Sequence, residues 1–110
     1  MHSTDWNNIG NLEEFPAGTV RVRKLAGLDV AVFRMADGRF FAIEDRCPHR
    51  GAALSKGILY DGDKIACADH GWSICLADGR ALPPECGQVM TFPVNVEDGR
   101  VHVWIEGGGQ

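Results

Sequence analysis

Apolar and polar residues alternate along several short stretches of the chain, as in strands that have one buried face. The segment TVRVRKL at 19–25 places its valines on one side and its arginines on the other. This period of two predicts a half-buried strand with the valines inward. The apolar segments VAVFRM at 30–35 and FFAI at 40–43 predict two further strands.

The dipeptide Asp-Gly follows apolar segments four times, in the sequences ADGR (36–39), YDGDK (60–64), ADGR (77–80) and EDGR (97–100). Asp-Gly between apolar runs is a strong signal for a tight hairpin turn. Four such turns in 110 residues predict a meander of antiparallel hairpins, so we expect an all-β fold, a small barrel or sandwich. The additional strands expected around these turns are Ile58–Tyr60, Ile65–Ala66, Trp72–Leu76, Thr91–Val96 and Val101–Ile105.

Few segments depart from this strand-and-turn pattern. Leu12–Phe15 is compatible with one helical turn, which Pro16 would end. Trp6 and Trp104 are expected to pack inside the sandwich. The residues from about 46 to 88 carry the most unusual loops and are expected to form a lobe inserted between the hairpins.

Composition and charge are those of one globular domain, expected to span residues 1–110. Hydrophobic residues make up 45% and charged residues 24%, and the net charge of −4 argues against a nucleic-acid surface, which requires clustered Lys and Arg. No apolar run approaches the ~20 residues of a membrane span. The first residues, MHSTDWNNIG, lack the basic start and apolar stretch of a secretory signal. We therefore expect a cytoplasmic protein without membrane partners, in which thiols stay reduced.

Two short segments combine cysteine, histidine and glycine, in the order Cys47-x-His49 and, seventeen residues later, Cys67-x-x-His70. A glycine follows close behind each histidine. Thiolate and imidazole are common metal ligands, and glycine lets a backbone approach a bound group closely. The paired pattern therefore predicts a metal centre held by Cys47, His49, Cys67 and His70.

Three interpretations of this pattern compete. Two cysteines and two histidines suffice for a tetrahedral zinc site, but zinc motifs usually group like ligands together. A mixed-ligand 2Fe–2S cluster has two cysteines on one iron and two histidines on the other, which suits loops that each offer one of each. Under the third interpretation the cysteines and histidines are placed by chance, which does not account for a cysteine–histidine pair recurring in two glycine-containing loops. We favour the 2Fe–2S cluster, with zinc as the alternative.

The segments CPHRGAALSKG and CADHGW together resemble the Rieske iron–sulfur motif. The stretches VAVFRMADGRFFAIEDRCPHRG and TFPVNVEDGRVHV resemble the small subunit of assimilatory NAD(P)H-dependent nitrite reductase. The segment SICLADGRALPPEC at 73–86 is similar to the ferredoxins of ring-hydroxylating dioxygenases, which share this length and fold. The resemblance extends from Trp6 to Ile105.

The resemblance implies a Rieske-type domain, an antiparallel sandwich or barrel base with an inserted cluster-binding lobe. It implies that Cys47 and Cys67 bind one iron as thiolates, and that His49 and His70 bind the other through one ring nitrogen each. The implied cofactor is a Rieske 2Fe–2S cluster.

The implied function is electron transfer, as the small subunit of NAD(P)H-dependent nitrite reductase. Its partner would then be a large subunit bearing flavin, a further iron–sulfur centre and sirohaem. The alternative is the ferredoxin of an aromatic-ring dioxygenase system, which accepts electrons from a flavin reductase and passes them to a terminal oxygenase. No catalytic triad, phosphate loop or dinucleotide fingerprint is present in the sequence, so chemistry on a substrate is expected to occur in the partner.

The resemblance also predicts a low reduction potential. High-potential Rieske proteins carry two further cysteines, and the matching positions here are Ala52 and Asp69. Hydroxyl groups that donate to the cluster sulfurs in those proteins are replaced by Trp72 and Ile74. Because fewer hydrogen bonds to sulfur disfavour the added electron, we expect a potential toward the ~−150 mV end of the Rieske range.

The remaining candidates have structural explanations. Cys75 and Cys86 are expected to be buried, reduced thiols. His102 alternates with valines and is expected on the solvent face of a strand. Trp72 either packs under its loop or contributes to a partner surface. The proline-containing loop near 81–88 is expected to fold over the same end of the domain as the ligands.

Overall fold

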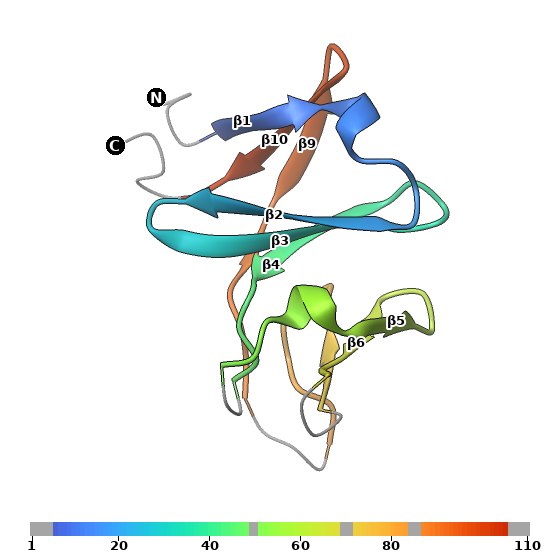
Figure 1. Cartoon of the computed structure of the whole chain (residues 1–110), viewed down its shortest axis with the longest axis vertical. Coiled ribbons are helices and arrows are strands. Elements are labelled where there is room, and N and C mark those ends of the chain that lie inside the picture. The colour runs from blue at the N-terminus through green and yellow to red at the C-terminus, as the bar shows by residue number, and fades with distance from the viewer. Residues whose placement is uncertain (1–5, 49–50, 69–71, 84–86, 106–110) are drawn as a thin grey trace.

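The computed structural model describes residues 6–48, 51–68, 72–83 and 87–105. Within these residues the chain forms ten strands and two short 3-10 helices, and the all-β fold is confirmed (Figure 1). The elements are β1 (Trp6–Asn11), η2 (Leu12–Glu14), β2 (Thr19–Leu25), β3 (Leu28–Arg34), β4 (Phe40–Glu44), η3 (Leu54–Lys56), β5 (Ile58–Tyr60), β6 (Lys64–Ala66), β7 (Ser73–Cys75), β8 (Thr91–Phe92), β9 (Val94–Glu97) and β10 (Arg100–Trp104).

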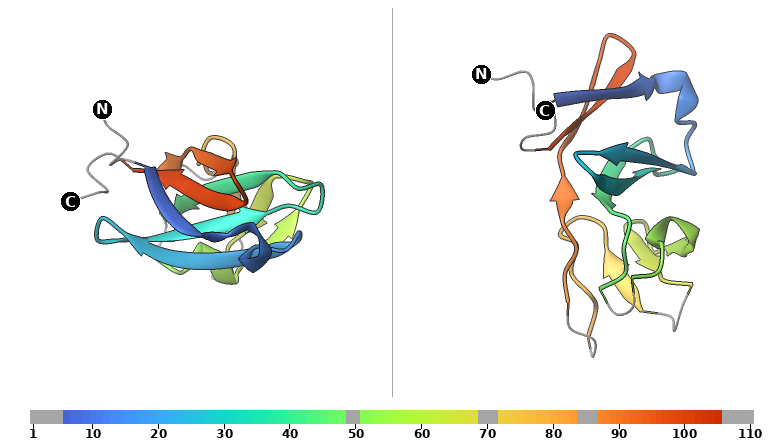
Figure 2. Two further views of the ribbon diagram at one scale, coloured as in Figure 1. Left: turned by 90° about the horizontal axis from the view of Figure 1, so that it is seen from above. Right: turned by 60° about the vertical axis from the view of Figure 1, so that its left-hand side comes forward.

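Three antiparallel sheets are stacked as successive layers (Figure 2, right). The outer sheet of the base has the order β1-β10-β9, the central sheet has the order β2-β3-β4-β8, and the lobe sheet has the order β5-β6-β7. The first two layers form the sandwich, and the third forms the lobe at the opposite end of the long axis from β1 (Figure 1).

Each pair of neighbouring layers encloses its own hydrophobic core. The base core consists of Ile9, Phe15, Val30, Val32, Ala42, Val101, Val103 and Ile105. The lobe core consists of Ala31, Phe33, Met35, Ile43, Cys47, Leu54, Ile65, Cys67, Ile74, Leu76 and Val89. Strand β3 therefore supplies alternate residues to the two cores, because successive side chains of a strand point to opposite faces. This explains why its apolar run is continuous.

The hairpins predicted from Asp-Gly are formed at three of the four turns, between β3 and β4, between β5 and β6, and between β9 and β10. The fourth turn, which follows β7, leads into isolated bridges instead of a strand. The expected strand 91–96 is divided at Pro93: β8 pairs with β4 in the central sheet, and β9 pairs with β10 in the outer sheet. Proline lacks the N–H that a continuous ladder needs, so the chain changes sheets at this residue.

Several predicted side-chain positions are wrong. Val22 is 42% exposed and Trp6 is 38% exposed, although both were expected inside. Val22 lies on the lobe-facing side of edge strand β2, and Trp6 pairs with Trp104 at the rim of the outer sheet. Trp104 is half-buried and alternates with the inward Val103. Arg23, expected outward, is half-buried with its guanidinium 5.1 Å from the centre of the Phe15 ring.

The helical turn predicted after residue 11 is confirmed as η2, and it leads into Phe15, which is fully buried. Strand β1 and helix η3 were not predicted from the sequence. None of the helices in the described part of the chain is long and apolar enough to cross a membrane.

Candidate metal centre

Cys47 and Cys67 occupy corresponding places at the ends of strands. Cys47 lies three residues after β4, and Cys67 directly follows β6. Their exposed fractions are only 1% and 3%, and both belong to the lobe core. The chain leaves β4 and β6 toward the same end of the lobe, farthest from the outer sheet (Figure 1). The fold therefore brings together the two cysteines that the sequence pattern paired.

The two cysteine loops are closed in the same way. The N–H of Cys47 donates to the carbonyl of Ala52 over 2.8 Å, and the N–H of Cys67 donates to the carbonyl of Trp72. Each bond spans five residues, so each loop is a six-residue segment that begins at a buried cysteine. In the first loop, the N–H of Gly51 also donates to the carbonyl of Cys47 over 2.7 Å, with Gly51 at φ +79°. That left-handed conformation explains the glycine after the first predicted ligand pair.

A third segment lies against both loops, as expected for the residues near 81–88. A Cβ at Gly87 would lie 3.0 Å from Cβ of Pro48 and 3.7 Å from Cζ3 of Trp72. Pro48 follows the first cysteine and Trp72 closes the second loop, so Gly87 shows that the two loops are close neighbours. Trp72 is half-buried against the lobe core, which supports its packing role.

Helix η3 braces the two loops, through residues that the sequence analysis did not single out. The Asp45 carboxylate accepts hydrogen bonds from the Ser55 N–H over 2.6 Å and from the Ser55 hydroxyl over 2.8 Å. Asp45 lies two residues before Cys47. Gly57, at the other end of η3, packs against the carbonyl of Ala66, the residue before Cys67. The sequence carries no signal for the bond between Asp45 and Ser55. The two residues are ten positions apart and belong to separate elements, so no local pattern relates them.

The outer face of the lobe sheet carries polar contacts. The Tyr60 hydroxyl donates to Oγ of Ser73 over 2.6 Å. The Asp63 carboxylate lies 3.2 Å from Nζ of Lys64 and 3.9 Å from Sγ of Cys75. The hydrogen bond that Lys64 donates to the Asp63 carboxylate raises the pKa of Lys64 above its ordinary value. Cys75 is a half-buried free thiol, less buried than expected, and Cys86 lies outside the described residues.

His49 and His70, the two predicted imidazole ligands, also lie outside the described residues. Accordingly, the described part of the chain contains no group of three or more potential metal ligands. What the structure describes fits an iron–sulfur cluster: two buried thiols begin two neighbouring closed loops, and positions 49 and 70 fall inside those loops. His102, the described histidine, is half-buried on β10 of the outer sheet, away from the lobe.

A family model described as "Rieske [2Fe-2S] domain" matches residues 5–93. The chain belongs to this family. The cofactor of the Rieske domain is therefore a Rieske 2Fe–2S cluster, and the alternative of a zinc-stabilised module is discarded. Membership of the Rieske family confirms the predictions of a Rieske fold and of an electron-transfer role.

Individual relatives of the domain are described as components of dioxygenases. This chain is 39% identical over 98 residues to the "3-phenylpropionate/cinnamic acid dioxygenase ferredoxin subunit" of Photorhabdus laumondii. The alignment covers 88% of this chain and 91% of that protein. A chain in the "complex of reduced oxygenase and oxidized ferredoxin in carbazole 1,9a-dioxygenase" superposes with a TM-score of 0.80 at 33% identity, covering 92% of this chain and 94% of that one.

A larger protein contains a similar domain. The terminal oxygenase of carbazole 1,9a-dioxygenase from Nocardioides aromaticivorans IC177 superposes with a TM-score of 0.82 at 30% identity. The match covers 93% of this chain but only 30% of the oxygenase chain. These similarities favour the dioxygenase ferredoxin over the small subunit of nitrite reductase, which was the first expectation from the sequence.

Proposed function

We propose that this Rieske domain is the ferredoxin component of an aromatic-ring-hydroxylating dioxygenase system, located in the cytoplasm. It would accept single electrons from a flavin reductase and deliver them to a terminal oxygenase. The observation that carries the proposal is the similarity along almost its whole length to a dioxygenase ferredoxin subunit. The match covers 91% of that ferredoxin subunit but only 30% of the oxygenase chain, which favours the ferredoxin role.

The proposed ligands are Cys47, His49, Cys67 and His70. The bound cluster supplies one-electron oxidation and reduction. The described residues supply its setting: the lobe core buries both thiols, and the closed loops hold their backbones. Such burial excludes water from the sulfur atoms, which lowers the local dielectric and tunes the potential. The loops lie at the end of the lobe, so a partner that binds this end comes within reach of the centre.

The ligand assignment is tested by matched substitutions. Cys47→Ala and Cys67→Ala are expected to abolish iron binding and the Rieske EPR signal of the reduced protein, whereas Cys75→Ala keeps both. Likewise, His70→Ala should lose the signal and His102→Ala should retain it. Iron and acid-labile sulfide are measured in each purified variant. Loss of iron in Cys75→Ala or His102→Ala, or its full retention in Cys47→Ala, would contradict the assignment.

The partner assignment is tested by mixing experiments. Reduced protein is mixed in a stopped-flow instrument with the terminal oxygenase of a ring-hydroxylating system, or with the large subunit of a nitrite reductase. We expect rapid bleaching and recovery of the Rieske absorption with the oxygenase only. Faster electron transfer to the nitrite reductase subunit would instead support the alternative function and leave the ligand assignment unchanged.

A further inference from the structure

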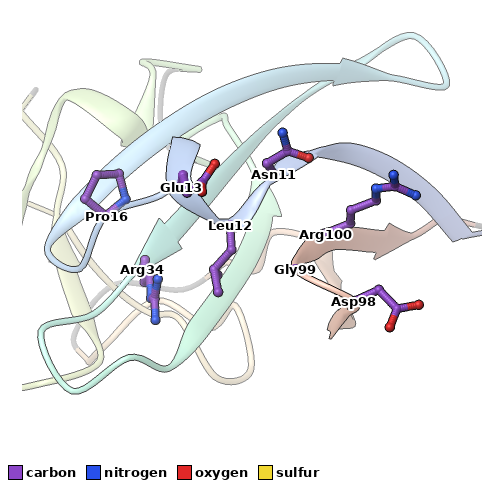
Figure 3. Close-up of a pocket in the computed structure, with 8 residues that line it drawn as sticks. All are labelled: Asn11, Leu12, Glu13, Pro16, Arg34, Asp98, Gly99 and Arg100. Atoms are coloured by element: carbon purple, nitrogen blue, oxygen red, sulfur yellow. The ribbon is translucent and has the colours of Figure 1, made fainter.

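The open end of the sandwich contains a depression of about 720 Å³, at the opposite end of the molecule from the cysteine loops (Figure 1). Its walls come from η2, from the turn between β9 and β10, and from Arg34 at the end of β3 (Figure 3). The N–H of Leu12 donates to the carbonyl of Gly99 over 2.8 Å and so joins two of these walls. The depression is thus bounded by regular elements of the base.

Arg34 is a half-buried cation without a counter-ion in the described part of the chain. Its Nη1 donates to the carbonyl of Phe15 over 3.1 Å, and its guanidinium carbon lies 5.1 Å from the centre of the Phe40 ring. Its Nε is buried and has no hydrogen-bond partner among the described residues. A buried donor without an acceptor is unfavourable, and more so when it is charged. Arg34 is therefore anchored through Nη1, no described residue accepts a hydrogen bond from Nη2, and the buried Nε is not accessible from the depression.

Arg23 provides an internal comparison on the same face of the central sheet. Its guanidinium lies 5.1 Å from the centre of the Phe15 ring, which packs edge-on against Phe40 at 6.1 Å. Unlike Arg34, it has an acceptor for each of its three nitrogens. Nε donates to the carbonyl of Ile9 over 3.1 Å, Nη1 donates to the carbonyl of Val22 over 3.2 Å, and Nη2 lies 3.4 Å from Oε1 of Glu14. The same aromatic pair thus supports two arginines, of which one has a carboxylate partner.

The other walls indicate the shape of a ligand. Asp98 and Arg100 lie on the far side of the depression from Arg34, Glu13 lies beside Leu12 on the η2 wall, and the Leu12 side chain points into the space between (Figure 3). Pro16 lines the wall near Arg34. Arg34 therefore borders the depression beside the apolar Leu12 and Pro16, and it forms no ion pair with either of the lining carboxylates, Glu13 and Asp98, within the described residues.

We propose that this depression binds a small organic monocarboxylate. The carboxylate accepts hydrogen bonds from the terminal Nη groups of Arg34, and the apolar body lies against Leu12 and Pro16. Planar guanidinium matches planar carboxylate through two parallel hydrogen bonds, which makes arginine the preferred partner for this group. This site is independent of the electron-transfer role proposed above.

The probe is benzoate, titrated into the cluster-loaded protein and followed by ¹H–¹⁵N NMR of backbone amides and arginine Nε–H groups. We expect saturable shifts at Arg34 and Leu12 with a Kd of about 1 mM, in keeping with one charged pair and a small apolar contact. Benzamide, which has the same shape without the charge, should not produce them, and inorganic phosphate, without an apolar body, should bind more weakly. Equal shifts from benzamide, or tighter binding of phosphate, would overturn the carboxylate assignment.

Variants locate the binding on Arg34. Arg34→Gln is expected to weaken benzoate binding at least about tenfold, the loss typical of a charge-assisted hydrogen bond. Arg23→Gln removes the other stacked arginine and should leave the affinity unchanged. Arg34→Lys keeps the positive charge but lacks the planar, parallel N–H donors of a guanidinium, so it should also bind benzoate more weakly. It serves as the test if thermal melting shows that Arg34→Gln is unfolded. Wild-type affinity in a folded Arg34 variant would refute the site.

Discussion

Near the cysteine loops, the backbone of Gly57 packs closely against the end of β6 at Ala66. The variant Gly57→Ala tests whether this contact positions Cys67. A Cβ at residue 57 would lie 2.2 Å from the carbonyl oxygen of Ala66 and 3.0 Å from Cγ1 of Ile65. The φ of Gly57 is −82°, which alanine adopts without strain, so the cost is purely steric. Restoring even a 3.0 Å separation requires about 0.8 Å of movement between η3 and the end of β6. Since Cys67 follows Ala66 directly, that movement reaches the second cysteine loop.

Overpacking of this kind costs about 1–3 kcal/mol. In a domain of this size, each kcal/mol lowers the melting temperature by about 4–8 °C. The assay follows thermal loss of the Rieske absorption and compares the EPR line shape of reduced wild type and Gly57→Ala. We expect both a lower melting temperature and an altered line shape, because the loop that begins at Cys67 is displaced.

Gly27→Ala is the matched control. Gly27 has φ +80° and would have no atom within 4 Å of a new Cβ, so its cost is conformational, about 1 kcal/mol. It lies in the turn between β2 and β3, in the central sheet of the base, and should lower the melting temperature without changing the EPR line shape. A wild-type melting temperature and spectrum in Gly57→Ala would refute the close contact. An equal spectral change in Gly27→Ala would show that the spectrum reports general destabilisation only.

Three further predictions concern the potential, pH dependence and packing. Redox titration is expected to give a midpoint near the ~−150 mV end of the Rieske range, and a clearly positive value would contradict this. The backbone N–H of Arg39 holds the pKa of Asp37 below its ordinary value of 3.8, so this carboxylate stabilises the fold above about pH 4 and the contribution is lost as pH falls through the lowered pKa. The melting temperature of Asp37→Asn should therefore depend less on pH below about 4, and parallel curves for the two proteins would disprove the effect. Leu54→Ala, which truncates a fully buried side chain, should cost about 2–5 kcal/mol. Ile58→Ala, at a residue 72% exposed, should change stability by less than about 0.5 kcal/mol, and similar melting temperatures for these two variants would contradict the described burial.

The candidate centre was predictable in part because its chemistry is local in sequence. Cys47 and Cys67 each begin a short glycine-containing segment, and a loop closed over five residues needs only its own backbone. The bracing of these loops was not predictable. Asp45 reaches Ser55, and Gly57 reaches Ala66, through contacts between separate elements that leave no periodic pattern.

The sequence by itself determined most of the strands, though not β1, and most of their turns, since alternation and Asp-Gly pairs act through the conformational preferences of neighbouring residues. Only the tertiary structure decided which faces are covered. Val22 and Arg23 exchange their expected environments because the lobe leaves part of β2 uncovered, while the edge of the outer sheet shelters the arginine. Similarly, Trp6 lies at a rim, and Pro93 divides one apolar stretch between two sheets. Burial depends on what packs against a face, and that partner is brought there from a distant part of the chain.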